Sequence, residues 1–175
     1  EIDLFSRTGT SVSHCPCSNM RLGSGILPLN KMLDKGVNIG LGVDGSASND
    51  SGNLLNEARQ ALYLQRVNET NNFYLNARNA LWLATAGGAT ALNRDDIGSI
   101  KIGNCADFAI YDSTSLELAG SVEDPIGGLI FCGPLKTRWT ICNGQIISEN
   151  NNIKNINIED TINQHNSLSR KLINS

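Results

Sequence analysis

The stretch Val37-Asn38-Ile39-Gly40-Leu41-Gly42-Val43-Asp44 is the most informative part of this 175-residue chain for its fold. Mostly apolar residues form a run of the length of a buried strand, and the run ends in a carboxylate that a polar loop, 45–51, follows at once. Ligands and metals of α/β folds bind at the edge where parallel strands end. Asp44 is therefore a candidate metal ligand and catalytic residue. The spacing alone favours the alternative, an Asp that only caps the following turn.

Outward from this strand, strand and helix patterns alternate through the first half of the chain. A short β-prone run over 10–13 ends at His14, a position at which a lone histidine is more often structural than catalytic. A break or a close helix contact is expected at Gly87-Gly88. Helices are expected from Pro28 until Gly36, over about 53–67 and over about 76–92.

The second half changes to short β-prone runs separated by Gly and Pro. Asn143-Gly144 lies between two such runs and indicates a type I′ hairpin. A terminal amphipathic helix follows, with His165 on its solvated surface. The β-prone runs cover 108–111, 129–132, 138–142 and 145–148. We therefore divide the chain into an α/β part, 1–95, an all-β part, 96–149, and a linker with the C-terminal helix, 150–175.

Composition excludes several classes of partner. The formal net charge is -3 and the basic residues form no stripe, so neither nucleic acid nor an anionic membrane is expected as a partner. No apolar run has the length of a membrane span. Five cysteines without a secretory signal favour free thiols and a cytoplasmic location. The chain opens at Glu1 without Met, and we expect it to begin within a longer protein.

Three sequence patterns resemble binding or catalytic motifs of other protein classes, but each lacks a residue that its class requires. Residues 40–45 match the G-x-G-x-x-G pattern of dinucleotide sites, but the Asp44 carboxylate would repel a pyrophosphate, and no acidic residue follows at the required distance. His14-Cys15-Pro16-Cys17 resembles half of a zinc site, yet no second ligand pair exists in the sequence. Met20 stands where the cytidine deaminase pattern needs its second cysteine, so that fold is excluded.

The residues 13–25, Ser-His-Cys-Pro-Cys-Ser-Asn-Met-Arg-Leu-Gly-Ser-Gly, resemble the seventh-strand motif of the amidohydrolase superfamily in its triazine hydrolase and guanine deaminase branch. Residues 40–50 resemble the eighth-strand motif of the same branch. The combination is most similar to the 8-oxoguanine deaminases. The similarity continues through shorter motifs at 86–89, 94–98, 106–108 and 131–134.

The resemblance implies an α/β fold: the C-terminal part of a (β/α)₈ TIM-like barrel, part of a small β-sandwich and a terminal helix. It also implies one divalent metal, usually zinc and sometimes iron, and no nucleotide cofactor. In this branch a His-x-His on the first strand, a His on the fifth strand and an Asp on the eighth hold the metal, and Asp44 matches that Asp. Asp44 would also accept the proton of the metal-bound water and pass it toward the leaving ammonia.

The resemblance further implies a substrate-binding set around Asp44. His14 would line the pocket, and Ser48 matches a position that faces the substrate. Asn19 belongs to the same set or holds its loop instead. Arg21 either meets a purine carbonyl or forms a pair on the surface.

The implied reaction is hydrolytic deamination of a purine-like base, with 8-oxoguanine giving urate and ammonia. Alternatives are deamination of guanine, hydrolysis of an s-triazine, and a non-catalytic shortened paralogue that acts as an association module. Barrel deaminases of this branch are often homo-oligomers. The sequence contains no His-x-His and no fifth- or sixth-strand His, so we expect this chain alone to be inactive.

Overall fold

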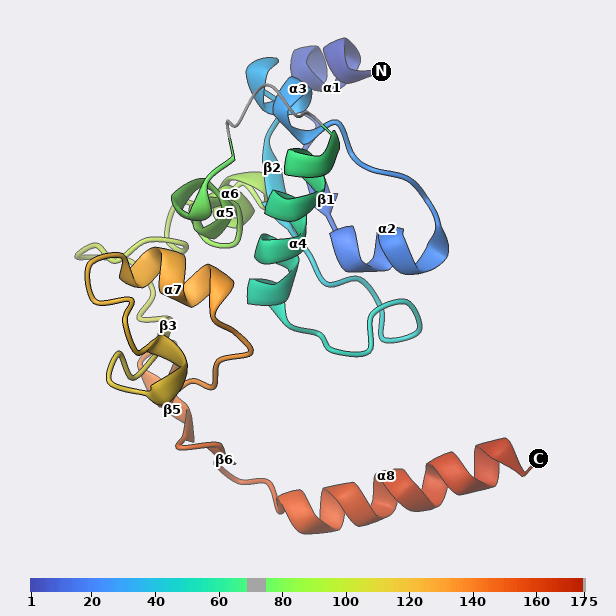
Figure 1. Ribbon diagram of the computed structural model, residues 1–175, viewed down its shortest axis with the longest axis vertical. Helices are drawn as coiled ribbons and strands as arrows, with labels where there is room; N and C mark the ends of the chain where they lie inside the picture. The colour runs from blue at the N-terminus through green and yellow to red at the C-terminus, as the bar shows by residue number, and fades with distance from the viewer. Residues whose placement is uncertain (69–74, 175) are drawn as a thin grey trace. The chain divides into compact units, whose positions relative to one another are not determined.

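The computed structural model describes residues 1–68 and 75–174 (Figure 1). The chain forms two compact units. Unit 1 contains residues 1–104 and 113–135, and unit 2 contains residues 105–112 and 136–175. Within the described residues, no helix is long and apolar enough to cross a membrane.

Unit 1 is built on two short parallel strands, β1 (Val12–His14) and β2 (Ile39–Leu41). The register pairs Val12 with Ile39 and His14 with Leu41. The longest helix of this unit, α4 (Leu54–Asn68), lies beside this pair and beside α2 (Pro16–Leu22) (Figure 1). The helices of this unit are α1 (Ile2–Thr8), α2 (Pro16–Leu22), α3 (Leu29–Asp34), α4 (Leu54–Asn68), α5 (Ala77–Leu83), α6 (Ala86–Ala91), the 3₁₀ helix η1 (Leu116–Leu118) and α7 (Pro125–Phe131).

The core of unit 1 forms where the apolar faces of these helices meet strand β2. The sequence predictions of the strand near 37–43 and of the helices near 28–35 and 53–67 are confirmed as β2, α3 and α4. Burial of such aliphatic side chains is the main source of stability in a unit of this size. Side chains with almost no exposed surface include Leu29, Ile39, Ala58, Ala61, Leu62, Leu83 and Ile130.

The expected break in the helical stretch 76–92 lies at Ala84-Thr85, between α5 and α6, rather than at Gly87-Gly88. The glycines instead allow a close contact between α6 and strand β2. A Cβ atom added to Gly40 would lie 2.7 Å from the Cα of Gly88, a distance that real Cβ atoms do not adopt. A Cβ on Gly87 would lie 2.8 Å from the carbonyl oxygen of Ile39. Glycine at positions 40 and 87 therefore lets the helix backbone approach the strand.

Residues 129–131 of the β-prone run 129–132 are helical, so the prediction of this run as a strand was wrong. Helix α7 begins with Pro125 at its first position, and the side chain of Asp124 accepts a hydrogen bond from the backbone N–H of Gly127. A Cβ on Gly128 would lie 2.5 Å from Ser121 Oγ, so glycine allows this helix to pack closely. Tertiary packing and a strong N-terminal cap outweigh the β-propensity of the run.

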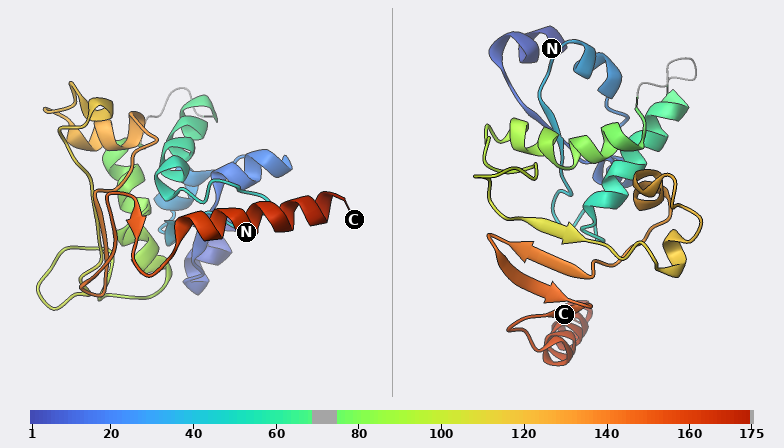
Figure 2. Two further views of the ribbon diagram at one scale, coloured as in Figure 1. Left: turned by 90° about the horizontal axis from the view of Figure 1, so that it is seen from below. Right: turned by 90° about the vertical axis from the view of Figure 1, so that its left-hand side faces the viewer.

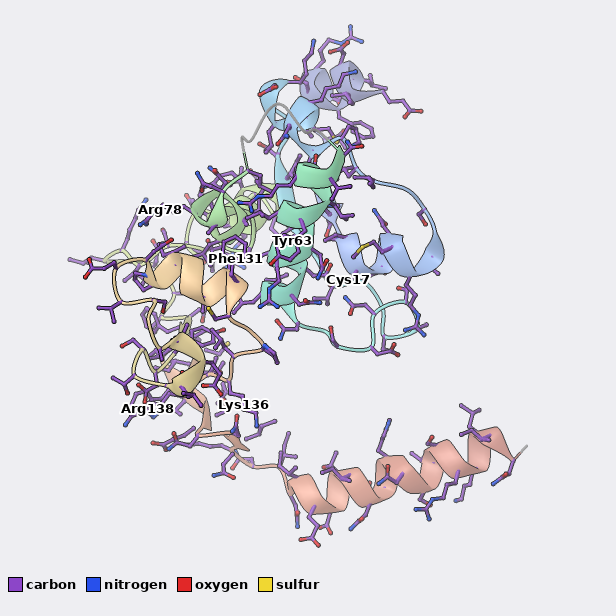
Figure 3. All side chains as sticks on the ribbon, in the orientation of Figure 1. Cys17, Tyr63, Arg78, Phe131, Lys136 and Arg138 are labelled. Atoms are coloured by element: carbon purple, nitrogen blue, oxygen red, sulfur yellow. The ribbon has the colours of Figure 1, made fainter. Side chains whose placement is uncertain are left out.

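Helix α7 is joined to α4 by contacts of aromatic and cationic side chains. The rings of Tyr63 and Phe131 stack with centroids 6.0 Å apart, and Figure 3 shows the two side chains between their helices. Arg59 Nε donates a 2.7 Å hydrogen bond to the carbonyl oxygen of Ile130. Arg66 lies over the Phe131 ring, 5.6 Å from its centroid. Segment 113–135 thus packs as part of unit 1.

Unit 2 is an antiparallel sheet of order β3-β4-β5-β6 followed by one helix (Figure 2). Asn143 and Gly144 both have positive φ, 47° and 76°, and connect β4 to β5 as the type I′ prediction requires. The elements are β3 (Phe108–Ile110), β4 (Trp139–Cys142), β5 (Gln145–Glu149), β6 (Asn152–Ile153) and the 16-residue helix α8 (Ile158–Ile173).

Candidate active site

Asp44 lies three residues beyond the last residue of β2, in a left-handed backbone conformation with φ 62°. Few residues other than glycine adopt this conformation, and Asp is among those that tolerate it. Such backbone conformations occur most often in turns and at functional sites. The side chain is therefore presented from a tight turn directly after the strand.

Three hydrogen bonds converge on the Asp44 carboxylate. Ser18 Oγ donates to Oδ2 over 2.5 Å, the backbone N–H of Gly45 donates to Oδ1 over 2.7 Å, and Ser48 Oγ donates to Oδ2 over 3.1 Å. The hydrogen bond from Ser18, then those from Gly45 and Ser48, lower the pKa of Asp44 below its ordinary value of 3.8. Asp44 is an anion at neutral pH, as a metal ligand or a proton acceptor must be.

Glu57 supports the loop that carries Asp44. This fully buried side chain on α4 accepts a 2.9 Å hydrogen bond from the backbone N–H of Cys17, at the start of α2. Its other oxygen accepts from Asn49 Nδ2 over 2.7 Å, and the same amide nitrogen donates to the carbonyl oxygen of Val43 over 2.7 Å. Glu57 thereby connects the segment after β1 with the segment after β2.

Sequence reasoning missed both Ser18 and Glu57. A signal for Glu57 was present, because it falls among the apolar positions Ala58, Ala61 and Leu62 of helix α4, where a charged residue needs a buried partner. Ser18 carried no such signal. Its contact with Asp44 depends on how two strands far apart in the sequence are paired.

His14 ends strand β1 and is only 2% exposed. Neither ring nitrogen has a hydrogen-bond partner among the described residues. Burial lowers the pKa of His14 to about 4, so the imidazole is neutral at physiological pH. Buried polar atoms without partners are rare in folded proteins, and this ring has the capacity to donate one hydrogen bond and accept another.

The other two predicted site residues lie on helix α2. Arg21 forms an ion pair with Asp50, and both side chains are more than half exposed. This is the surface pairing that was one of the two alternatives for Arg21. Asn19 is partly buried, and its backbone carbonyl accepts the N–H of Ser24 where α2 ends. Ser48 is the one predicted substrate-facing residue that contacts Asp44 directly.

The cysteines of the Cys-Pro-Cys motif are not arranged as a metal site. Burial, and then the Glu57 carboxylate, raise the pKa of Cys17 to about 12, and burial is also the main cause of the raised pKa of Cys15. A protonated thiol is a poor metal ligand. Among residues 1–68 and 75–174, no three His, Cys, Asp or Glu side chains form a group that could hold a metal. Asp44 fits a metal as one anionic ligand of a larger set.

Comparison with known proteins identifies the family. Residues 1–159 match the model of the amidohydrolase family. The chain belongs to this family. The amidohydrolase chain is 47% identical over 132 residues to the 8-oxoguanine deaminase of Pseudomonas aeruginosa, a match that covers 75% of this chain and 29% of that protein. It is 39% identical over 148 residues to the 5-methylthioadenosine/S-adenosylhomocysteine deaminase of Halobacterium salinarum, covering 84% of this chain and 34% of the relative.

Solved structures of amidohydrolases confirm the α/β fold. Atrazine chlorohydrolase from Arthrobacter aurescens, complexed with zinc, superposes with a TM-score of 0.89 at 34% identity, over 96% of this chain and 38% of that one. An adenosine deaminase from Xanthomonas campestris with bound zinc gives a TM-score of 0.90 at 28% identity, over 99% of this chain and 40% of that one. The chain thus spans less than half the length of the relatives it matches.

Proposed function

We propose that this amidohydrolase chain is the C-terminal part of a metal-dependent enzyme that hydrolytically deaminates a purine-like base, with 8-oxoguanine as the preferred substrate. The observation that carries the proposal is the Asp44 carboxylate, which is ionised and held by three donors at the end of β2. The 47% identity to an 8-oxoguanine deaminase supports the choice of substrate.

The metal proposed for this site is zinc, and the zinc-bound structures of two related proteins support it. Asp44 would be one ligand, and the proposal requires further ligands from outside the chain. The chemistry that bound zinc supplies in such sites is ionisation of a water molecule near neutral pH. Asp44 would also hold the proton removed from that water, since an ionised carboxylate within hydrogen-bond reach can act as a general base.

The substrate would be bound by residues around Asp44. His14 is proposed to face the base, because its neutral ring has hydrogen-bonding capacity that no described residue uses. Ser48 holds Asp44 and is proposed to contact the substrate as well. Asn19 and Arg21 are proposed as more distant members of the set, with the Arg21–Asp50 pair opening if Arg21 reaches a purine carbonyl.

The proposal also concerns organisation and location. Residues 1–95 would be the last strands and helices of a TIM-like barrel, 96–149 a segment of a β-sandwich, and 150–175 a linker and terminal helix. The five cysteines, which form no disulfide within the described residues, support a cytoplasmic location. A role in purine metabolism follows from the proposed substrate.

A second substrate class is supported by other relatives. Deaminases of 5′-deoxyadenosine and of 5-methylthioadenosine or S-adenosylhomocysteine share 33% to 39% identity with this chain. The compounds in these names are purine nucleosides or their thioethers. The alternative substrate is therefore an aminopurine that carries a sugar at N9, in place of a free oxidised base.

The test is ammonia release by the zinc-loaded polypeptide that carries this chain together with the remaining ligands. We expect 8-oxoguanine to give a higher kcat/KM than guanine, 5′-deoxyadenosine or an s-triazine. Asp44→Asn should lower kcat by about 10²–10⁴-fold, the usual range for a general acid–base residue. Asp34→Asn, which changes an exposed carboxylate outside the proposed site, is the matched control. Full activity of Asp44→Asn would refute the mechanism, and a preference for 5′-deoxyadenosine would refute the substrate. Residues 1–175 alone should release no ammonia.

A further inference from the structure

The two segments that hold the Asp44 carboxylate are weakly held by their own structure. Ser18, which donates the shortest of the three hydrogen bonds to this carboxylate, lies in the first turn of α2. This seven-residue helix has no side-chain hydrogen bond at its N-cap, and a helix of that length is unstable alone. Asp44 itself adopts a left-handed backbone conformation that is unfavourable for residues other than glycine. A group outside both segments must therefore hold them in place.

The Glu57 side chain supplies the missing cap of α2. Pro16, the first residue of this helix, has no N–H, so the backbone N–H of Cys17 is the first donor that the helix leaves without an internal partner. Glu57 Oε2 accepts this N–H over 2.9 Å from helix α4, and Figure 3 shows Cys17 at the end of α2 that faces α4. A carboxylate at a helix N-terminus also interacts favourably with the helix dipole. Because Ser18 follows Cys17 directly, Glu57 fixes the position of the residue that donates to Asp44.

The other oxygen of Glu57 acts on the Asp44 turn itself. Glu57 Oε1 accepts from Asn49 Nδ2 over 2.7 Å, and the same amide group donates to the carbonyl oxygen of Val43 over 2.7 Å. This carbonyl belongs to the planar peptide unit that joins Val43 to Asp44, so its direction limits the φ angle of Asp44. The Ser51 hydroxyl donates to Asn49 Oδ1 over 3.1 Å, which fixes the orientation of the amide. The turn is thereby tied to the same carboxylate as helix α2.

A glutamate suits this double role. Both oxygens of its carboxylate accept hydrogen bonds, whereas glutamine offers one acceptor and aspartate is one methylene shorter. Among the described residues, the hydrogen bonds of Asp44 come from donors other than Glu57, so Glu57 acts on it through the two links. We propose that Glu57 is a positioning residue for the deamination, which orients the Asp44 carboxylate through Ser18 on one side and through the Val43–Asp44 peptide on the other. This inference rests on the proposed function, in which Asp44 is the proton acceptor.

Titration of Asp44 in this chain tests the positioning role without any need for activity. Glu57→Gln should raise the pKa of Asp44, because the Ser18 hydrogen bond that lowers it most is displaced. An effect of charge alone would have the opposite sign, since removal of a nearby anion lowers the pKa of a carboxyl group. In a Ser18→Ala background, Glu57→Gln should change this pKa much less, because both residues act through one link. Carbon-detected NMR of the unaltered chain, the two single variants and the double variant would measure these changes.

Kinetics of the zinc-loaded polypeptide that carries this chain together with the remaining ligands give a second readout. Glu57→Gln should lower kcat about 10–100-fold, the usual cost of removing a group that orients a metal ligand, with KM nearly unchanged. Asn49→Ala breaks only one of the two links, so it should lower kcat and raise the pKa of Asp44 by less. It also serves as the test if circular dichroism shows that Glu57→Gln does not fold.

Ala61→Gly is the control for lost stability, because it weakens the same helix one turn further along. It should leave both kcat and the pKa of Asp44 unchanged. An unchanged or lowered pKa of Asp44 in Glu57→Gln, a full effect of Glu57→Gln in the Ser18→Ala background, or an equal loss of kcat in Ala61→Gly would each overturn the positioning role. Failure of the proposed function would appear separately, as full activity of Asp44→Asn.

Discussion

Ser18 Oγ donates a 2.5 Å hydrogen bond to Asp44 Oδ2, and this bond joins the helix that follows one strand to the turn that follows its neighbour. The parallel pairing of β1 with β2 brings the two residues together although they are 26 positions apart. The carboxylate is thus oriented and kept ionised by groups within this chain.

The Ser18–Asp44 contact predicts how the carboxylate titrates. Ser18→Ala should raise the pKa of Asp44, because the largest cause of its lowering is removed, and Ser48→Ala should raise it less, because its bond is longer. Carbon-detected NMR of the Asp44 side chain between pH 2 and 6 would measure both changes. An equal or larger change in Ser48→Ala would contradict the ranking.

Replacing Glu57 tests whether its hydrogen bonds hold together the segments that follow β1 and β2. Glu57→Gln puts an amide group where an acceptor now serves Cys17 N–H or Asn49 Nδ2, so one buried donor loses its partner. The expected loss in the free energy of unfolding is about 1–3 kcal/mol. Urea denaturation followed by circular dichroism would measure it.

The control for this change is Glu123→Gln, at an exposed position of the same unit, which should alter stability by less than about 0.5 kcal/mol. If the two variants were equally stable, the Glu57 carboxylate would not be holding the two segments together.

The buried histidine predicts a pH dependence of stability. His14 has a pKa of about 4 in the folded chain, against 6.5 when exposed. Above pH 6.5 it is neutral in both states. As the pH falls from 6.5 to 4 the unfolded chain binds a proton that the folded chain does not, so folding loses up to about 3 kcal/mol across this window. Below pH 4 this residue causes no further loss.

Denaturation midpoints of the unaltered chain and of His14→Gln, measured at several pH values between 7 and 4, would isolate this contribution. Glutamine does not titrate in this range, so the variant should show the smaller slope whatever its absolute stability. Parallel slopes would mean that the ring is hydrated and accepts its proton in the folded state.

The Gly40–Gly88 contact predicts a steric cost. Gly40→Ala would place a Cβ 2.7 Å from the Cα of Gly88 and 3.2 Å from its nitrogen, and backbone atoms cannot turn aside as a flexible side chain can. Overpacking of this kind costs about 1–3 kcal/mol. Gly45→Ala is the comparison, since nothing lies within 4 Å of its added Cβ. Thermal unfolding of both should show a lower Tm for Gly40→Ala alone.

Much of the fold was accessible from the sequence because its signals are local. The strand ending before Asp44, the helix over 54–68 and the Asn143-Gly144 hairpin each follow from periodicity or turn chemistry within a few residues. Helix α7 was missed because its apolar residues favour a strand in isolation. Its Asp124-Pro125 start and its packing on α4 decide otherwise.

The site was accessible in part. Asp44 stood out as a carboxylate after an apolar strand, and Ser48 was identified through the motif that both belong to. The supporting contacts of Ser18 and Glu57 were not accessible, because they join residues 26 and 40 positions apart whose proximity depends on the parallel register. The free ring nitrogens of His14 were likewise visible only once its burial was known.

The parallel pairing of β1 with β2 also has a consequence for the order of folding. Cys142 and Gln145 meet across the two-residue turn of the hairpin, whereas Val12 meets Ile39 only after the whole segment containing α2 and α3 has been enclosed. Hairpins form within microseconds, and contacts between distant residues form more slowly because closing a long loop costs entropy. We expect the Asp44 turn to be among the last parts of unit 1 to reach its final geometry, so protection of its amides from hydrogen exchange should appear after that of α4.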